Sequence, residues 1–176
     1  MVPEAPLEKT EHGLRVSGEG WFVANARDLR WFEGELGLYT MFDSEDARFE
    51  QVGVNIGILR PGEPNCMYHA EGAQEDFLVL SGECLLIVEG QERRLKAWGF
   101  VHCPPWTEHV FVGAGDGPCV VIGVGARTKG RGLRYAVNEV ALRHGAGVEV
   151  ETLEPSVAYA RFAEDKPIAC PEEFPD

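Results

Sequence analysis

Residues 68–83 read YHAEGAQEDFLVLSGE and place several potential metal ligands directly before an apolar run. His69 stands two positions before Glu71, and Glu75 opens the run that Gly82 ends. Side chains two positions apart on an extended chain share a face, so His69 and Glu71 can converge on one point. The segment therefore predicts a buried strand whose entrance carries side chains able to bind a cation.

A second segment, FVHCPPWTEHVFV (residues 100–112), supplies another histidine. Pro104 and Pro105 predict a turn, and His109 begins a strand on which Phe111 shares its face. A β-barrel could bring both segments together, and two imidazoles with two carboxylates form a suitable ligand set for a divalent ion. The expected metal ligands are His69, Glu71, Glu75 and His109. Gln74 could point inward in place of Glu75 if the loop register differs by one.

Short aromatic or β-branched runs separated by turn residues extend over most of the chain, a spacing typical of an all-β sandwich or barrel. A hairpin is predicted at Glu89-Gly90-Gln91, where glycine supplies the turn. The expected strands are WFVANA (21–26), GLYTMF (37–42), FEQVGVNIGIL (49–59), DFLVL (76–80), CLLIVE (84–89), RRLKAW (93–98), FVHC (100–103), HVFVG (109–113) and CVVIGVGA (119–126).

The pattern divides the chain into an N-terminal arm (1–19), a β-barrel (20–127) and a C-terminal helical extension with a tail (128–176). Residues 135–145 predict a helix with Asn138 as its N-cap and Gly145 beyond its end. Residues 154–164 predict a second short helix with Pro155 in its first turn. The polar first dozen residues and the acidic, proline-rich tail from Lys166 are expected to be an arm and a frayed end.

Composition limits the partners. The 176 residues carry a formal charge of −13 with a pI near 4.8, which argues against nucleic acid and anionic membranes as partners. No apolar run is long enough to cross a bilayer, and the N-terminus lacks the apolar core of a secretory signal. Five cysteines without a CxxC spacing favour a reducing, cytoplasmic setting.

The two histidine segments resemble the motifs of the cupin superfamily. His69, Glu75 and Gly82 match the first motif in spacing, and Glu71 stands where that motif has its second histidine. The second motif keeps its proline and histidine, whereas its glycines are replaced by tryptophans. The kept residues are Pro104 and His109, and the replacements are Trp98 and Trp106. The resemblance covers about residues 45–127 and implies an RmlC-like jelly roll (a double-stranded β-helix), a bound divalent ion and a homodimer.

The extra carboxylate hardens the ligand set, so iron, manganese, zinc or nickel is expected rather than copper. Tyr68 and Trp106 adjoin turns beside the ligands and are expected as pocket wall, together with Phe111. His102 and Cys103 are adjacent, so at most one of them faces the barrel interior, and either could line the pocket.

Three functions remain open from the sequence. The first is a metal-dependent enzyme acting on a small organic molecule, of dioxygenase, isomerase or decarboxylase type. The second is a non-catalytic module that binds a small ligand or metal. The third is a metal-free barrel that only scaffolds a dimer, in which the histidines are hydrogen-bonded core residues and Glu71 is a solvated turn carboxylate.

Overall fold

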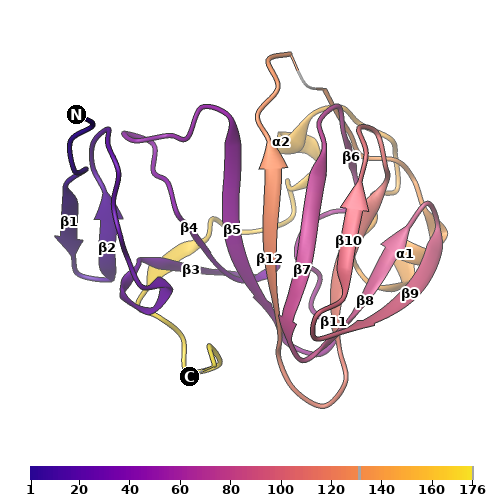
Figure 1. The fold of residues 1–176 in the computed structure, drawn as a ribbon. Coiled ribbons are helices and arrows are strands. Elements are labelled where there is room, and N and C mark those ends of the chain that lie inside the picture. The colour runs from indigo at the N-terminus through magenta and orange to yellow at the C-terminus, as the bar shows by residue number, and fades with distance from the viewer. Residues whose placement is uncertain (131, 176) are drawn as a thin grey trace.

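The computed structural model describes residues 1–130 and 132–175, which form mainly antiparallel β-sheets with few, short helices (Figure 1). Arg131 and Asp176, which fall within the expected C-terminal extension, lie outside the described residues. The all-β expectation is confirmed.

The larger sheet contains seven antiparallel strands in the order β10-β7-β12-β5-β4-β3-β14. Along its central strand β5, residues 55, 57 and 59 face the second sheet, whereas Ile56 and Ile58 pack on the opposite side. This alternation is the two-residue period of a strand covered on both faces. The strands are β3 Trp31–Gly34, β4 Gly37–Met41, β5 Val52–Leu59, β7 Glu75–Ser81, β10 Phe100–Cys103, β12 Cys119–Ala126 and β14 Lys166–Ile168.

The second sheet consists of β11 (His109–Ala114), β8 (Glu83–Val88) and β9 (Gln91–Lys96) in that order. A single antiparallel bridge between His69 and His109 continues it toward the short pair β6 (Ala70–Glu71) and β13 (Leu133–Arg134). From β7 to β12 the chain crosses repeatedly between the two sheets, because β7, β10 and β12 belong to the larger sheet, whereas the β8–β9 hairpin and β11 belong to the smaller one. The architecture is a double-stranded β-helix, or jelly roll.

The main core fills the space between the sheets. Val79 and Val121 from the larger sheet pack against Leu86 and Phe111 from the smaller one, and all four are buried. The turn that sends the chain from β7 to β8 depends on Gly82, whose φ is 73°. A Cβ atom there would lie 2.3 Å from the carbonyl oxygen of Pro118, so the position admits only glycine.

The predicted hairpin and both predicted helices are present. Glu89 and Gly90 join β8 to β9 with φ values of 49° and 70°, the geometry of a tight hairpin turn. Helix α1 (Glu139–Arg143) begins after Asn138, whose side chain accepts hydrogen bonds from two backbone N–H groups. Helix α2 (Pro155–Ala158) has its proline in the first turn. Ala141 of α1 packs against the outer side of the smaller sheet.

Both ends of the chain are more ordered than the sequence indicated. Strands β1 (Leu7–Thr10) and β2 (Gly13–Val16) form a hairpin that projects beside the larger sheet (Figure 1). The tail adds β14 to the edge of β3, and Phe174 packs its ring 5.0 Å from that of Trp31. The expected strand at residues 21–26 is absent, and a 3₁₀ helix begins at Ala26 instead.

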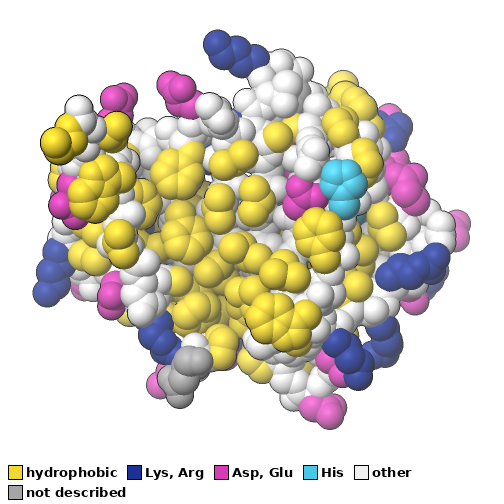
Figure 2. All heavy atoms as spheres, in the orientation of Figure 1, with side chains coloured by type: hydrophobic (Ala, Val, Ile, Leu, Met, Phe, Trp, Pro, Cys, Tyr) yellow, Lys and Arg dark blue, Asp and Glu magenta, His cyan; other side chains and the backbone are white. Residues whose placement is uncertain are grey.

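The outer face of the larger sheet is unusually apolar. Figure 2 shows hydrophobic side chains gathered across its middle. Trp98 and Phe100 are 75% and 63% exposed, and they adjoin strands whose outward side chains are half-buried. These outward residues are Val54, Leu78, Leu80, Ile122 and Val124. Among the described residues, no helix combines the length and apolar character needed to cross a membrane.

Candidate metal centre

The two histidines of the centre lie directly opposite each other on neighbouring segments. The N–H of His109 donates to the carbonyl oxygen of His69 at 2.9 Å, and the reciprocal bond is 3.2 Å long. Their side chains therefore project on the same side of the sheet, and the ring centroids are 5.1 Å apart. Both side chains are buried, with residue exposures of 9% for His69 and 1% for His109.

Each imidazole is oriented by a backbone carbonyl oxygen. Nδ1 of His69 lies 2.8 Å from the carbonyl oxygen of Met67, and Nδ1 of His109 lies 3.0 Å from that of Thr107. Because a carbonyl oxygen can only accept a hydrogen bond, each Nδ1 carries the hydrogen and each Nε2 carries the lone pair. Metal-ligating histidines are typically held in this way by a partner on the other ring nitrogen.

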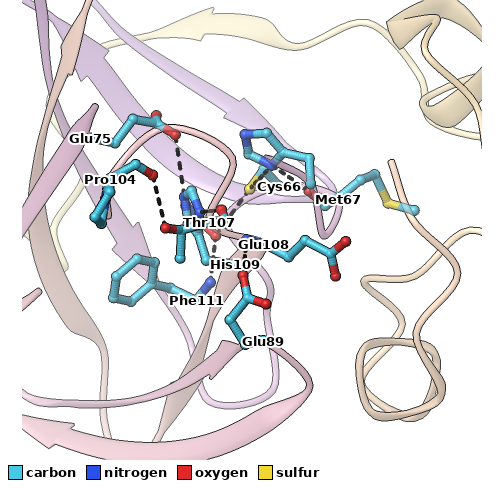
Figure 3. A network of polar contacts seen from close by, with 11 residues as sticks. Cys66, Met67, Glu75, Glu89, Pro104, Thr107, Glu108, His109 and Phe111 are labelled. Atoms are coloured by element: carbon cyan, nitrogen blue, oxygen red, sulfur yellow. Dashed lines mark hydrogen bonds and ion pairs between the residues drawn. The ribbon is translucent and has the colours of Figure 1, made fainter. Parts of the chain in front are cut away.

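The carboxylate of the centre comes from the opposite sheet. Glu75 is the first residue of β7, and its Oε2 lies 3.5 Å from Nε2 of His109, the contact drawn between these two residues in Figure 3. Potential ligand atoms of His69, Glu75 and His109 all lie within 4.8 Å of one another. Bonds from a transition metal to such ligands are about 2.0–2.2 Å long, so small side-chain rotations suffice to bring the three atoms onto one ion.

Electrostatics favours a neutral imidazole at His109. Its burial lowers its pKa below the ordinary value, because the protonated ring would lose its hydration, and this outweighs the opposing effect of the Thr107 carbonyl. A neutral ring keeps the lone pair that a metal ligand needs. The donor set of two imidazoles and one carboxylate therefore fits a divalent transition metal.

The three residues line one side of a cavity of about 290 Å³ between the two sheets. Phe77 and Phe111 form an aromatic wall beside His109, with centroid distances of 4.7 Å between the two phenyl rings and 5.2 Å from Phe77 to the imidazole. The remaining walls come from β4, β5 and β12. Their lining residues include Tyr39, Met41, Asn55, Gly57, Leu59, Val121 and Gly123.

The expected fourth ligand lies outside this group. Glu71 faces an adjoining hollow of about 170 Å³ that also contains Arg48 and Arg127 and meets the main cavity at Glu75. The structure therefore brings ligand atoms of three of the four expected residues within 4.8 Å of one another, and Glu71 is not part of this group. Of the two residues that could point inward at the start of β7, Glu75 is the one that lines the cavity. Gln74 is exposed, and its side-chain amide donates to Asp76 at 2.6 Å.

The expected pocket residues occupy different environments. Phe111 lines the cavity. Tyr68 is fully buried on the far side of the smaller sheet, where its hydroxyl donates to Glu108 at 3.0 Å. Trp106 is 53% exposed and its ring covers Gly72 and Gly132, so neither Tyr68 nor Trp106 is among the residues that line the cavity.

His102 and Cys103 point to opposite faces of β10, as their adjacency requires. His102 is exposed on the outer face, and its Nδ1 lies 2.6 Å from Asp76. Cys103 is buried at 2% exposure but is not among the residues that line the cavity. The expectation that one of this pair lines the pocket is therefore not met by the cavity beside the histidines.

Several further residues surround the centre, of which the sequence pointed only to Cys66, as a conceivable zinc ligand near the first motif. Cys66 lines the cavity, and its Sγ lies 3.7 Å from Nδ1 of His69 (Figure 3 shows Cys66 beside Met67). Burial, followed by the charges of Glu75 and Glu71, raises the pKa of this thiol far above its ordinary range. Asn65 fixes the neighbouring strand by accepting the N–H of Phe111 at 2.9 Å. The alternation of inward and outward side chains along β4 and β5 was the sequence signal that could have identified the other lining residues.

The fold and the site together define a double-stranded β-helix protein with a candidate two-histidine, one-glutamate centre. Residues 55–125 match the family described as the cupin domain. This segment includes both histidine motifs, and the resemblance to the cupin superfamily is confirmed.

Solved structures show the same fold at low identity. A sugar phosphate isomerase of the cupin superfamily from Silicibacter pomeroyi is 24% identical over 57% of this chain and 66% of that one, with a TM-score of 0.51. A cupin protein from Bacteroides fragilis is 17% identical over 62% of this chain and 86% of that one, with a TM-score of 0.50. This chain thus spans just under two thirds of the isomerase. Comparison with curated proteins gives no significant match.

Proposed function

We propose that this protein is a metal-dependent enzyme that acts on a small organic molecule held in the cavity between its sheets. His69, His109 and Glu75 would hold the ion. The observation that carries the proposal is the orientation of the two imidazoles, whose Nδ1 atoms are hydrogen-bonded to the backbone while Nε2 of His109 lies 3.5 Å from the Glu75 carboxylate.

Two histidines and one carboxylate on one side of an ion are typical of iron(II) oxygenases, and manganese, zinc and nickel accept the same donors. Such an ion would supply Lewis-acid or dioxygen chemistry at its remaining coordination positions. The protein itself would hold the donors in place, neutralise part of the ionic charge with Glu75 and exclude water with the walls around Phe77 and Phe111.

The other ionisable side chains of the cavity favour chemistry centred on the ion. Among the described lining residues these groups are Cys66 and Tyr39. Burial raises the pKa of each, and a hydrogen bond of 2.9 Å to Asp165 adds to the effect at Tyr39. Neither group is a base at neutral pH, so the site offers little for a proton-shuttling isomerisation by side chains alone. The same observation supports, as the alternative function, a module that binds metal or ligand without turnover.

Metal analysis of the purified protein tests the proposal. We expect about one iron, manganese, zinc or nickel ion per chain, and loss of that ion in His69→Ala and in His109→Ala. His102→Ala is the matched control, because this histidine is exposed on the outer face of β10. A wild-type protein that stays folded and cannot be loaded with any of the four metals would overturn the proposal. Loaded protein that turns over none of a panel of phenols and small acids would favour the alternative.

We also propose that a second copy of the chain covers the outer face of the larger sheet. Contiguous apolar surface on this scale usually marks an interaction site, and twofold pairing of identical faces is the commonest arrangement. The exposed rings of Trp98 and Phe100 and the half-buried residues beside them, among them Leu78 and Val124, support a flat, self-complementary contact.

A further inference from the structure

The cavity beside the metal centre contains almost no means of binding a phosphate group. Recognition of phosphate relies on arginine, lysine or clustered backbone N–H donors. Among the described residues that line the cavity there is no arginine and no lysine, and the acidic side chain Glu75 is present. The nearest arginines, Arg48 and Arg127, belong to the adjoining hollow. Arg127 is committed to Asp43, with an N–O distance of 2.5 Å.

The walls instead suit an apolar body. Phe77 and Phe111 present their rings, and Leu59 and Val121 add aliphatic surface. An apolar protein cavity of about 150 Å³ holds benzene, so the 290 Å³ present here accommodates a ring with substituents. Asn55, an exposed residue of β5 that lines the cavity, can contact a polar substituent.

One glycine in the cavity wall leaves space that a side chain would fill. Gly57 lies in the middle of β5 and faces the cavity. A Cβ atom added there would meet only the carbonyl oxygen of Leu38, at 3.9 Å, and the backbone there is not in the left-handed region. Gly123 differs, because a Cβ atom there would lie 3.0 Å from the side chain of Asn55 and 3.3 Å from Phe77. The space in front of Gly57 is therefore open to a ligand.

From these observations we propose that the natural ligand has an apolar body about the size of a substituted six-membered ring and carries no phosphate group. Gly57 is the residue that sets its size. This inference rests on the proposed function, which places the reaction at the metal centre. It excludes sugar phosphates as substrates, although the fold is similar to that of a sugar phosphate isomerase.

Calorimetric titration with two pairs of ligands tests the inference. Phenol and cyclohexanol are the apolar probes, and phenyl phosphate and fructose 6-phosphate are the phosphorylated ones. We expect phenol or cyclohexanol to bind, and each phosphorylated compound to bind at least tenfold more weakly, in both metal-free and zinc-loaded protein. Equal or tighter binding of a phosphorylated probe, or no binding by either apolar probe, would overturn the inference.

The variant Gly57→Leu places a side chain in the cavity from β5, a strand that carries none of the three proposed ligands. It should weaken binding of the apolar probe at least tenfold while the zinc content stays unchanged. Gly117→Leu is the matched control, because a Cβ atom there meets nothing within 4 Å and the residue lies in the loop before β12. Unchanged probe binding by Gly57→Leu would show that the cavity is not the binding site. Failure of the wild type to take up metal would instead count against the proposed function, since the probes are also titrated into metal-free protein.

Discussion

His69 and His109 are joined by two reciprocal backbone hydrogen bonds, and the same pairing places their imidazoles side by side. The residues are forty positions apart in the sequence, yet their relative position is fixed by main-chain geometry rather than by side-chain packing. Glu75 belongs to the facing sheet and approaches from across the cavity. The centre thus consists of two imidazoles held by the backbone of one sheet and one carboxylate from the other.

The two glutamates of the first motif should differ in their effect on metal binding. Glu75→Gln removes the charged donor nearest His109 and should lower metal affinity tenfold or more, because an amide neutralises none of the ionic charge. Glu71→Gln, in the adjoining hollow, is the matched control and should retain nearly full affinity. Competition with a chromogenic chelator measures both. Equal losses in the two variants would restore the four-ligand set expected from the sequence.

Acid should destabilise the metal-free protein partly through His109. Burial lowers the folded-state pKa of this residue below the unfolded value of about 6.5, so below that pH the unfolded chain binds the extra proton first. Stability is therefore present above about pH 6.5 and declines as the pH falls toward the folded-state pKa, by at most about 1.4 kcal/mol per pH unit from this group. Urea unfolding between pH 7.5 and 5.5 should show a shallower decline for His109→Gln. His12→Gln, on the N-terminal hairpin, should behave like the wild type.

A charge placed on the outer face of the larger sheet should separate the proposed dimer. Phe100 is 63% exposed, so Phe100→Asp should leave the fold intact while burying an unpaired carboxylate in any contact made by this face. Sedimentation velocity should show a dimer for the wild type and a monomer for the variant. Val150→Asp changes a residue that is 76% exposed elsewhere on the chain and should remain dimeric. A monomeric wild type would remove this proposal.

Backbone conformation at Trp98 should favour glycine over alanine. Trp98 and Trp106 stand where the second motif has glycines, and both have a φ of 71°, in the left-handed region. A residue with a Cβ atom costs about 1–2 kcal/mol in that region, partly offset by the greater freedom of glycine in the unfolded chain. Trp98→Gly should therefore unfold at a higher urea concentration than Trp98→Ala, by about 1 kcal/mol in unfolding free energy. A less stable glycine variant would contradict this reasoning.

The sequence predicted the barrel well because its signals are local. Turn residues at short intervals predicted most strands, and the N-cap Asn138 and the first-turn proline Pro155 located the two helices. The ends of the chain were misjudged, since β14 and the hairpin of β1 and β2 gain their order from pairing partners that composition does not reveal. At residues 21–26 the aromatic run indicated a strand, but Asn25 caps the following 3₁₀ turn by accepting the N–H of Arg27.

The site was predictable in its histidines and less so in its surroundings. His69, His109 and Glu75 followed from motif spacing, whereas Glu71 matches the motif in the sequence but lines the adjoining hollow beside Glu75. Tyr68 adjoins His69 in the sequence, but neighbours along an extended chain point to opposite faces. Trp106 lies in the turn before β11, outside the cavity. The role of Gly57 became visible only when the facing strands were brought together, because a cavity is formed by several segments at once.

The bare backbone at Gly57 has a consequence for how this scaffold can diversify. Because Gly57 has no side chain, the cavity extends as far as the backbone of β5, a strand that carries none of the proposed metal ligands. Exchanging this single residue for alanine, valine or leucine would shorten the chamber in steps and leave the reactive end as it is. If the proposals hold, ligand size and metal chemistry would depend on separate parts of the chain, and mutation could alter one without redesigning the other.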